Sequence, residues 1–237
     1  MFFRTPRKRG QAQVSQRMFK MLLLFLVSLA IVVGLHKVFY VWSQKISYSY
    51  DWAQQFWALL ASGFILILMF DRWVLPAFSQ QTFRSLAWGD VFRVLFDPSF
   101  LAFLVLVVVL TTISLIDYWY YEIPNEYNAL VFALGLAWAF SRSSSWEQAF
   151  LASLVLFGLF FVLMVATKGQ LGAGDVKLVA GLGLFLGVPG VLPFFMYSFL
   201  MAALVSVFLL ATKKKKRSDR LPFGPFLVAG FFLAFFG

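Results

Sequence analysis

Cysteine is absent from this chain of 237 residues, and histidine occurs once, as His36. Without cysteine there is no disulfide, no thiol nucleophile and no cysteine-ligated zinc, and one histidine does not make a polyhistidine metal centre. Charged residues are also scarce, at 13% against about 25% in soluble domains. Only ten residues are acidic, so any acid–base chemistry falls to these carboxylates. We expect no metal ion and no cofactor.

Hydrophobic residues dominate the composition, at 62%, with 31 Phe and 8 Trp, and the mean hydropathy is +0.85. They form long blocks without the alternation that barrel strands need, and such blocks suit helices in lipid. The sequence therefore predicts an all-α protein, a polytopic transmembrane helical bundle. The net charge of +10 comes from short basic clusters between the blocks, which are typical of membrane topology anchors rather than of a nucleic-acid site.

About eight helices are expected, in two regions. Residues 1–99 hold two hydrophobic blocks, 19–35 (extending as far as 42) and 52–70, and an amphipathic stretch, 71–98, which we expect at the membrane interface. The first block lacks a convincing small-residue cleavage site, so we interpret it as a retained helix or signal anchor. No role is assigned to this region. Residues 100–237 hold six shorter blocks: 100–116, 127–140, 147–166, 176–187, 191–211 and 223–237.

The order of the blocks predicts on which side of the membrane the acids lie. Two crossings separate Asp117 from Asp175, so both belong to the same face. Two further crossings lead to the basic run 213–217 on that face, and Lys168 and Lys177 agree. Positive residues in short loops mark the cytoplasm, so we expect both aspartates to face it.

The N-terminal charges conflict with this rule. Counting back through two spanning blocks places the basic stretch 4–20 outside the cell. Either one of these blocks does not fully cross, or part of 71–98 crosses or re-enters, or the N-terminal charges are overridden. The sequence leaves these alternatives open.

Only two acids combine apolar flanks with a shared membrane face. Asp117 ends the block from 100 to 116, and Asp175 precedes the block from 176. Two carboxyl groups in a low-dielectric site can share one proton, so that one activates a water molecule while the other polarises a peptide carbonyl and later protonates the leaving amine. The alternative is that both are interfacial helix caps or salt-bridge partners.

Three motifs surround these aspartates. The segment from Asp117 to Asn125 fits D-x5-I-P-N, and 172–178 reads Gly-Ala-Gly-Asp-Val-Lys-Leu. Pro222-Phe223-Gly224-Pro225 then opens the last block. In this order, within a six-helix core, the motifs resemble those of the type IV prepilin peptidases, bacterial aspartic membrane proteases of the GxGD class. The resemblance covers residues 100–237.

The resemblance implies that Asp117 and Asp175 are the catalytic pair. It also implies that Gly172 and Gly174 let the chain turn tightly beside the second aspartate, through positive φ or close backbone approach. Lys177 matches the family lysine and is expected either to favour the ionised state of a nearby carboxylate or to anchor its helix at the cytoplasmic interface.

Further residues are expected to shape the site or the packing. Pro124 and Asn125 would shape the loop beyond Asp117. The 222–225 motif would line the substrate groove, or would simply start a helix with its prolines. Gly183 and Gly187 form a small-xxx-small pair that lets helices approach closely.

The function implied is that of a membrane-embedded aspartic endopeptidase of the bacterial inner membrane. It would remove the short basic leader of type IV prepilins or pseudopilins at the cytoplasmic face, after a glycine and just before the substrate's hydrophobic helix. Larger family members carry paired cysteines associated with zinc binding and N-methylation; this chain has none, so the sequence gives no support for methyltransferase activity or S-adenosylmethionine binding. The expected partners are prepilins or pseudopilins and the lipid bilayer, with no nucleic acid. The alternatives are an inactive assembly factor for a pilus or secretion machine, a small ion- or proton-coupled transporter, and a presenilin-like protease.

Overall fold

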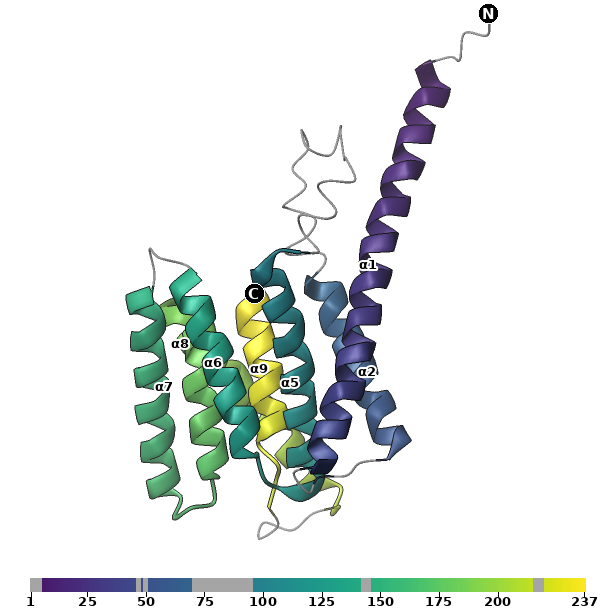
Figure 1. Cartoon of the computed structure of the whole chain (residues 1–237). Helices are drawn as coiled ribbons and strands as arrows, with labels where there is room; N and C mark the ends of the chain where they lie inside the picture. The colour runs from purple at the N-terminus through teal and green to yellow at the C-terminus, as the bar shows by residue number, and fades with distance from the viewer. Residues whose placement is uncertain (1–5, 46–47, 49–50, 70–95, 142–145, 215–219) are drawn as a thin grey trace, which may run out of the picture.

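The structure is a computed structural model that describes residues 6–45, 48, 51–69, 96–141, 146–214 and 220–237. Throughout these ranges the regular structure is helical, which confirms the predicted all-α class. Figure 1 shows the helices packed side by side as a bundle. The seven helices of the described ranges are α1 Pro6–Lys45, α2 Trp52–Met69, α5 Pro98–Tyr120, α6 Asn125–Ser141, α7 Trp146–Ala166, α8 Ala173–Ala211 and α9 Gly224–Phe236.

Helix α8 contains two of the predicted helices joined at a break. Gly187 has φ 64° and ψ 177°, which interrupts the helical backbone within Ala173–Ala211. Pro189 follows, at a position where its missing N–H and fixed φ suit the start of a new helical limb. The predicted blocks 176–187 and 191–211 therefore correspond to the two limbs of α8, and about eight helical segments result. The expectation that Gly187 packs against a neighbouring helix is wrong, because a Cβ there would contact only the ring of its neighbour Pro189.

Gly183 does allow close helix packing, as expected. A Cβ at this position would lie 2.6 Å from the Cα of Ser153 on α7. The Ser153 hydroxyl also donates a 2.7 Å hydrogen bond to the carbonyl of Ala180. The first limb of α8, which begins at Asp175's turn, is therefore held directly against α7.

Helix α5 lies at the centre of the bundle and packs against α1, α2, α6 and α9 (Figure 1). Its start is determined locally: the Asp97 side chain accepts hydrogen bonds from the backbone N–H groups of Ser99 and Phe100, and Pro98 occupies the first turn. Its middle is buried on every side, from Leu106 to Leu110. Asp117, the acidic residue of α5, therefore lies on a helix that its neighbours largely bury.

Helices α1 and α2 form an antiparallel pair beside α5 (Figure 1). A chain of buried polar groups joins the three helices: His36 Nε2 lies 2.7 Å from Ser62 Oγ, and Ser62 Oγ lies 3.1 Å from Thr111 Oγ1. Helix α1 begins at Pro6 rather than near residue 19, so the expected polar N-terminal segment is helical from that residue.

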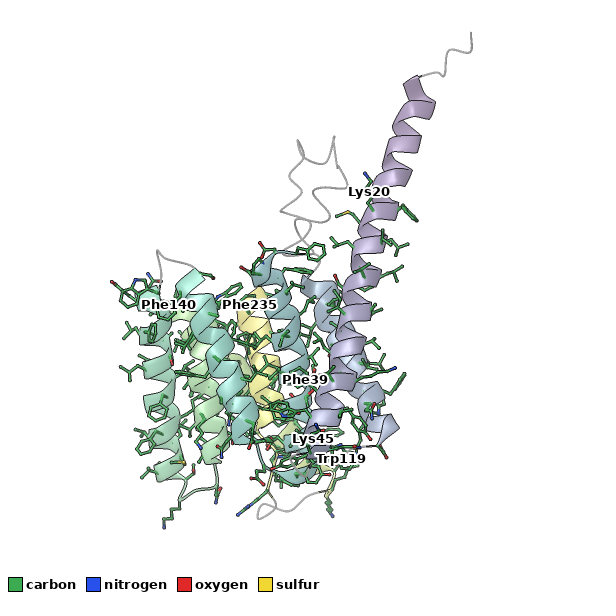
Figure 2. The ribbon with its side chains drawn as sticks, viewed as in Figure 1. Lys20, Phe39, Lys45, Trp119, Phe140 and Phe235 are labelled. Atoms are coloured by element: carbon green, nitrogen blue, oxygen red, sulfur yellow. The ribbon has the colours of Figure 1, made fainter. Side chains whose placement is uncertain are left out.

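The apolar exterior suits a bilayer. Within the described ranges, four helices are long and apolar enough to span a membrane: residues 19–45 of α1, and α5, α7 and α8. Lys20 and Lys45 stand near the two ends of the apolar part of α1 (Figure 2), and its 27 residues rise about 40 Å. The protein is a multi-pass helical membrane protein. The amphipathic stretch expected at 71–98 lies almost wholly outside the described residues.

The connections after α5 and after α7 lie at one end of the bundle (Figure 1). Helix α1 begins at the opposite end. The two predicted aspartates therefore share an end, and the basic start of α1 points away from them.

Candidate active site

Asp117 lies in the last turn of α5 and is 5% exposed. The helix is capped by Tyr121, whose backbone is left-handed (φ 56°) and whose N–H donates to the Asp117 carbonyl at 2.9 Å. The Asp117 carboxylate accepts a 2.7 Å hydrogen bond at Oδ2 from the backbone N–H of Gly224. Gly224 is the first residue of α9, so Asp117 satisfies one of the donors that a helix start leaves unpaired.

Asp175 lies in the first turn of α8 and is 7% exposed. Its Oδ2 accepts a 3.1 Å hydrogen bond from the N–H of Gly172, the residue before the helix. Its Oδ1 is buried and has no hydrogen-bond partner among the described residues. One oxygen of this carboxyl group is therefore oriented by the protein and the other is unused.

The two carboxyl groups are close enough to interact electrostatically. Each is held by a backbone N–H at the start of a helix, where the helix dipole favours negative charge. Helices α5 and α8 thus bring together two buried acids that lie 58 positions apart in the chain. Among the described residues no three histidine, cysteine or acidic side chains come together as a metal site.

At three positions glycine is required because a neighbouring atom lies too close for a Cβ, and not because the backbone has a positive φ. A Cβ at Gly224 would lie 2.8 Å from Asp117 Oδ2, and a Cβ at Gly172 would lie 3.1 Å from Asp175 Oδ2. A Cβ at Gly174 would lie 3.0 Å from the Cβ of Ile123. Gly172 has φ −71°, so of the two expected reasons for a glycine here, close approach applies and positive φ does not.

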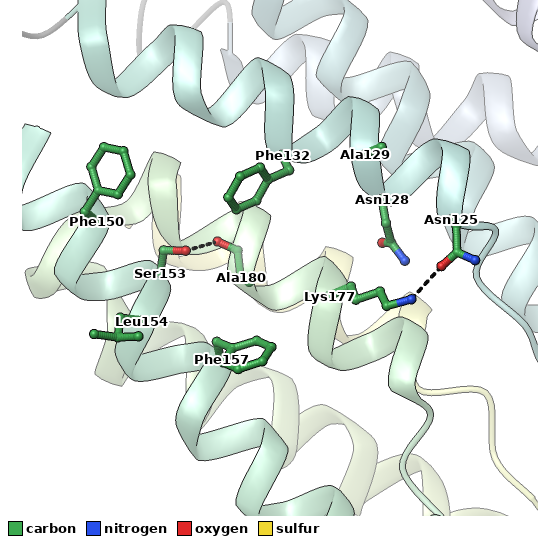
Figure 3. A pocket seen from close by; sticks show the side chains of 10 residues that line it. All are labelled: Asn125, Asn128, Ala129, Phe132, Phe150, Ser153, Leu154, Phe157, Lys177 and Ala180. Atoms are coloured by element: carbon green, nitrogen blue, oxygen red, sulfur yellow. Dashed lines mark hydrogen bonds between the residues drawn. The ribbon is translucent and has the colours of Figure 1, made fainter.

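Two hydrogen bonds join the first turn of α6 to the start of α8. The Lys177 ammonium group donates to Asn125 Oδ1 at 2.7 Å (Figure 3). The Asn128 amide donates to the Gly174 carbonyl at 3.3 Å. The partner of Lys177 is thus the side-chain amide of the Ile-Pro-Asn motif. The sequence had suggested a nearby carboxylate or the membrane interface instead.

The remaining predicted residues surround this end of the bundle. Pro124 is buried, and its carbonyl accepts from the N–H of Asn128 in the first turn of α6. Pro222 is buried before α9, and Phe223 packs its ring against Phe199, with ring centroids 5.2 Å apart. Pro225 lines a cavity that is described below.

Comparison with known proteins finds a family that resembles part of this chain. Residues 104–207 match the type IV leader peptidase family, and two curated proteins are similar over part of their length. A prepilin leader peptidase/N-methyltransferase of Bacillus subtilis (strain 168) is 31% identical over 134 residues, which are 55% of this chain and 53% of the relative. A protein of the same name from Xanthomonas campestris pv. campestris is 39% identical over 71 residues, 30% of this chain and 25% of the relative.

The matched parts span about half of the Bacillus relative and a quarter of the Xanthomonas relative. No solved structure matches the chain. Asp117 and Asp175 lie inside the leader-peptidase region, whereas Gly224 follows it and α2 precedes it. The hydrogen bond between Gly224 and Asp117 therefore links a residue outside the matched region to one within it.

Sequence reasoning missed Asn128 and Ile123 in the leader-peptidase region. Asn128 is 5% exposed, and its Oδ1 has no partner among the described residues. Its spacing of three from Asn125 places both amides on one side of α6, and this spacing is the signal that could have identified it. Ile123 appeared in the sequence only as part of the Ile-Pro-Asn motif. Its contact with Gly174 arises from tertiary packing.

Two cavities lined by described residues lie near the aspartate end. One has a volume of about 520 Å³ and lies among α6, α7 and α8, with Lys177, Asn125 and Asn128 at one end and Phe132, Phe150 and Phe157 farther along (Figure 3). The other has a volume of about 740 Å³, lies among α2, α5 and α9, and includes Tyr118 and Pro225 in its lining. The two cavities therefore lie among different helices of the bundle.

An acidic side chain marks the α1–α2 side of this end. Tyr48, between α1 and α2, packs edge-on against Tyr120, with ring centroids 5.2 Å apart. Burial, and next the neighbouring Glu122 carboxylate, raise the pKa of the Tyr48 hydroxyl. Glu122 therefore lies beside Tyr48 in the α1–α2 connection, whereas the Lys177 ammonium group binds Asn125 at the start of α6.

Proposed function

We propose that this protein is a membrane-embedded aspartic endopeptidase that removes the short basic leader of type IV prepilins or pseudopilins. The printed names of both relatives include prepilin leader peptidase activity, and the family match supports the same reaction class. The observation that carries the proposal is the pair of buried carboxyl groups, Asp117 and Asp175, which interact at one end of the bundle and are each oriented by a backbone N–H.

The reaction needs one ionised and one protonated carboxyl group. The ionised carboxylate removes a proton from a water molecule as the water oxygen attacks the scissile carbonyl carbon. The protonated partner donates a hydrogen bond to the carbonyl oxygen, which carries the developing negative charge. When the tetrahedral intermediate breaks down, the C–N bond cleaves and the amine leaves with a proton from a carboxyl group. The unused Oδ1 of Asp175 is available to hold the water.

Hydrogen bonding orients the two acids in the same way. Because Gly224 and Gly172 each bind one oxygen, each carboxyl group keeps a fixed orientation and presents its second oxygen to the substrate. Preorganised groups of this kind contribute to catalysis because they need no reorganisation during the reaction.

We place the aspartates at the cytoplasmic face of the inner membrane. Lys168, Lys213 and Lys214 lie in connections at the aspartate end, and Lys177 lies near the start of α8 at the same end. Positive charge in short loops favours the cytoplasm. The basic start of α1 would then face outward, so in this assignment the N-terminal charges are overridden.

The test is co-expression with a prepilin, whose mass reports loss of the leader. We expect cleavage by the wild type, and none by Asp117→Asn or Asp175→Asn, because an amide neither accepts the water proton nor donates an acidic one. Glu126→Gln is the matched control: it removes an exposed acid in the first turn of α6 and is expected to leave cleavage intact.

Each outcome discriminates between functions. Near-normal cleavage by either asparagine variant would refute the two-aspartate mechanism. A folded, membrane-inserted wild type that cleaves no prepilin would favour the assembly-factor role instead. The mass of the mature product also shows whether a methyl group is added.

A further inference from the structure

The larger cavity is an elongated groove between α2 and α9, floored by α5. It combines three small residues with large apolar walls: Ala58 and Ala61 of α2 and Ala229 of α9 leave the space, and Trp57 and Phe64 bound it. Its lining is mostly apolar, and its few polar groups come from Gln54, Thr111, Ser114 and Tyr118.

One end of the groove reaches the aspartate site. Tyr118 directly follows Asp117, and Pro225 directly follows Gly224, whose N–H binds the Asp117 carboxylate. From Pro225 the lining continues along α9 to Leu233, a rise of about 12 Å. The groove therefore runs from the residues that follow Asp117 and Gly224 about two helical turns along α9 into the bundle.

The far wall is held in place by polar bonds. Ser62 on α2 is linked both to His36 on α1 and to Thr111 on α5, and Thr111 also lines the groove. Hydrogen bonds between helices within the apolar bundle restrict how α2 can move against α5. The space between α2 and α9 is thus part of the packed structure.

We propose that this groove binds the first turns of the substrate's hydrophobic helix, immediately after the scissile peptide bond, so that α2 is part of the substrate-binding surface. This inference rests on the proposed function. A peptidase that cuts just before a hydrophobic helix needs an apolar surface that begins close to its catalytic carboxylates. This groove is lined by Tyr118 and Pro225, which directly follow Asp117 and its hydrogen-bond donor Gly224. Small residues such as Ala61 and Ala229 let a second helix backbone approach closely, which is how helices associate in lipid.

Charge favours this groove over the smaller cavity. A short basic leader continues from the scissile bond away from the membrane, on the side where the helix enters. On the α2 side that path passes Glu122 beside Tyr48, whereas the smaller cavity ends at the Lys177 ammonium group. Attraction to Glu122 and repulsion from Lys177 both direct the leader to the α2 side.

Cysteine cross-linking tests this arrangement directly, because the chain has no cysteine of its own. In full-length Asp175→Asn, which prevents turnover, Ala61→Cys and Ala229→Cys are each oxidised in membranes with a prepilin that carries one cysteine in the second turn of its hydrophobic helix. We expect a disulfide-linked adduct at both positions. Ala133→Cys, on the exposed face of α6, is the control and gives none. An adduct at Ala129→Cys in the smaller cavity, with none at 61 or 229, would overturn the proposal.

Filling the groove is the second test, in the active protein. We expect Ala61→Trp to lower prepilin cleavage at least tenfold, mainly by raising KM, and Ala133→Trp to leave it unchanged. One outcome refutes the inference alone: the wild type and Ala61→Trp cleave equally well, and neither position 61 nor position 229 forms an adduct. The groove would then hold lipid, and the proposed function would stand. If the wild type cleaves no prepilin, the proposed function fails, and adducts at 61 and 229 then still report docking.

Discussion

Gly224→Ala changes the contact that orients Asp117 without removing any catalytic group. The added Cβ would lie 2.8 Å from Asp117 Oδ2, whereas an ordinary contact is at least 3.4 Å, so the carboxylate must retreat by about 0.6 Å or more. The retreat strains the 2.7 Å hydrogen bond from the Gly224 N–H. Such bonds to charged groups contribute about 1.5–3 kcal/mol, and a misplacement of about 1 Å costs about 100-fold in rate.

We therefore expect kcat for prepilin cleavage to fall about 10- to 100-fold in Gly224→Ala, with KM nearly unchanged. The assay is cleavage of purified prepilin by purified enzyme in detergent, followed by mass spectrometry over time. Gly158→Ala on α7 is the matched control, because nothing lies within 4 Å of a Cβ there and alanine favours a helix. A Gly224→Ala enzyme that keeps half of the wild-type kcat would refute the reasoning, because the carboxylate would then tolerate displacement.

Three further predictions test the contacts around the site. Lys177→Met removes the 2.7 Å hydrogen bond to α6, and we expect a few-fold lower kcat with an unchanged melting temperature, because the bond is exposed. Ser62→Ala removes the hydroxyl that links α1, α2 and α5, and should lower the free energy of unfolding in detergent by about 1 kcal/mol; Ser28→Ala, which loses only a bond within α1, should lower it less. Gly183→Ala drives a Cβ to 2.6 Å from Ser153 and should destabilise the protein by about 1–3 kcal/mol, measured by thermal unfolding. Equal stability of the wild type and Gly183→Ala would contradict the packing of α7 on α8.

Helix positions followed well from the sequence because apolar blocks and turn residues act locally. The prediction of 147–166 corresponds to α7 Trp146–Ala166, and that of 52–70 to α2 Trp52–Met69. The break within α8 was expected between 187 and 191, where glycine and proline occur together, and Gly187 provides it. The role of Gly187 in packing was predicted wrongly, because a small-xxx-small spacing does not distinguish a contact from a bend.

The hydrogen-bond partners at the candidate site did not follow from the sequence. Gly224 binds Asp117 across 107 positions, and Lys177 binds Asn125 across 52. No local pattern pairs residues at such separations, because the pairing depends on how α5, α6, α8 and α9 pack. The glycines near Asp175 were expected to allow positive φ and close backbone approach; the packed structure requires close approach at Gly172 and Gly174, and Gly172 has a negative φ.

The sequence alone determined the class of protein, because long apolar blocks are stable in lipid whatever their partners. It also singled out the two acids, because the free-energy cost of a carboxyl group beside an apolar block depends only on composition and spacing. The tertiary structure decided which backbone N–H groups hold those acids and that α2 and α9 leave a groove beside Asp117. These features depend on distances between helices that are remote in the chain, and side-chain packing between them sets those distances.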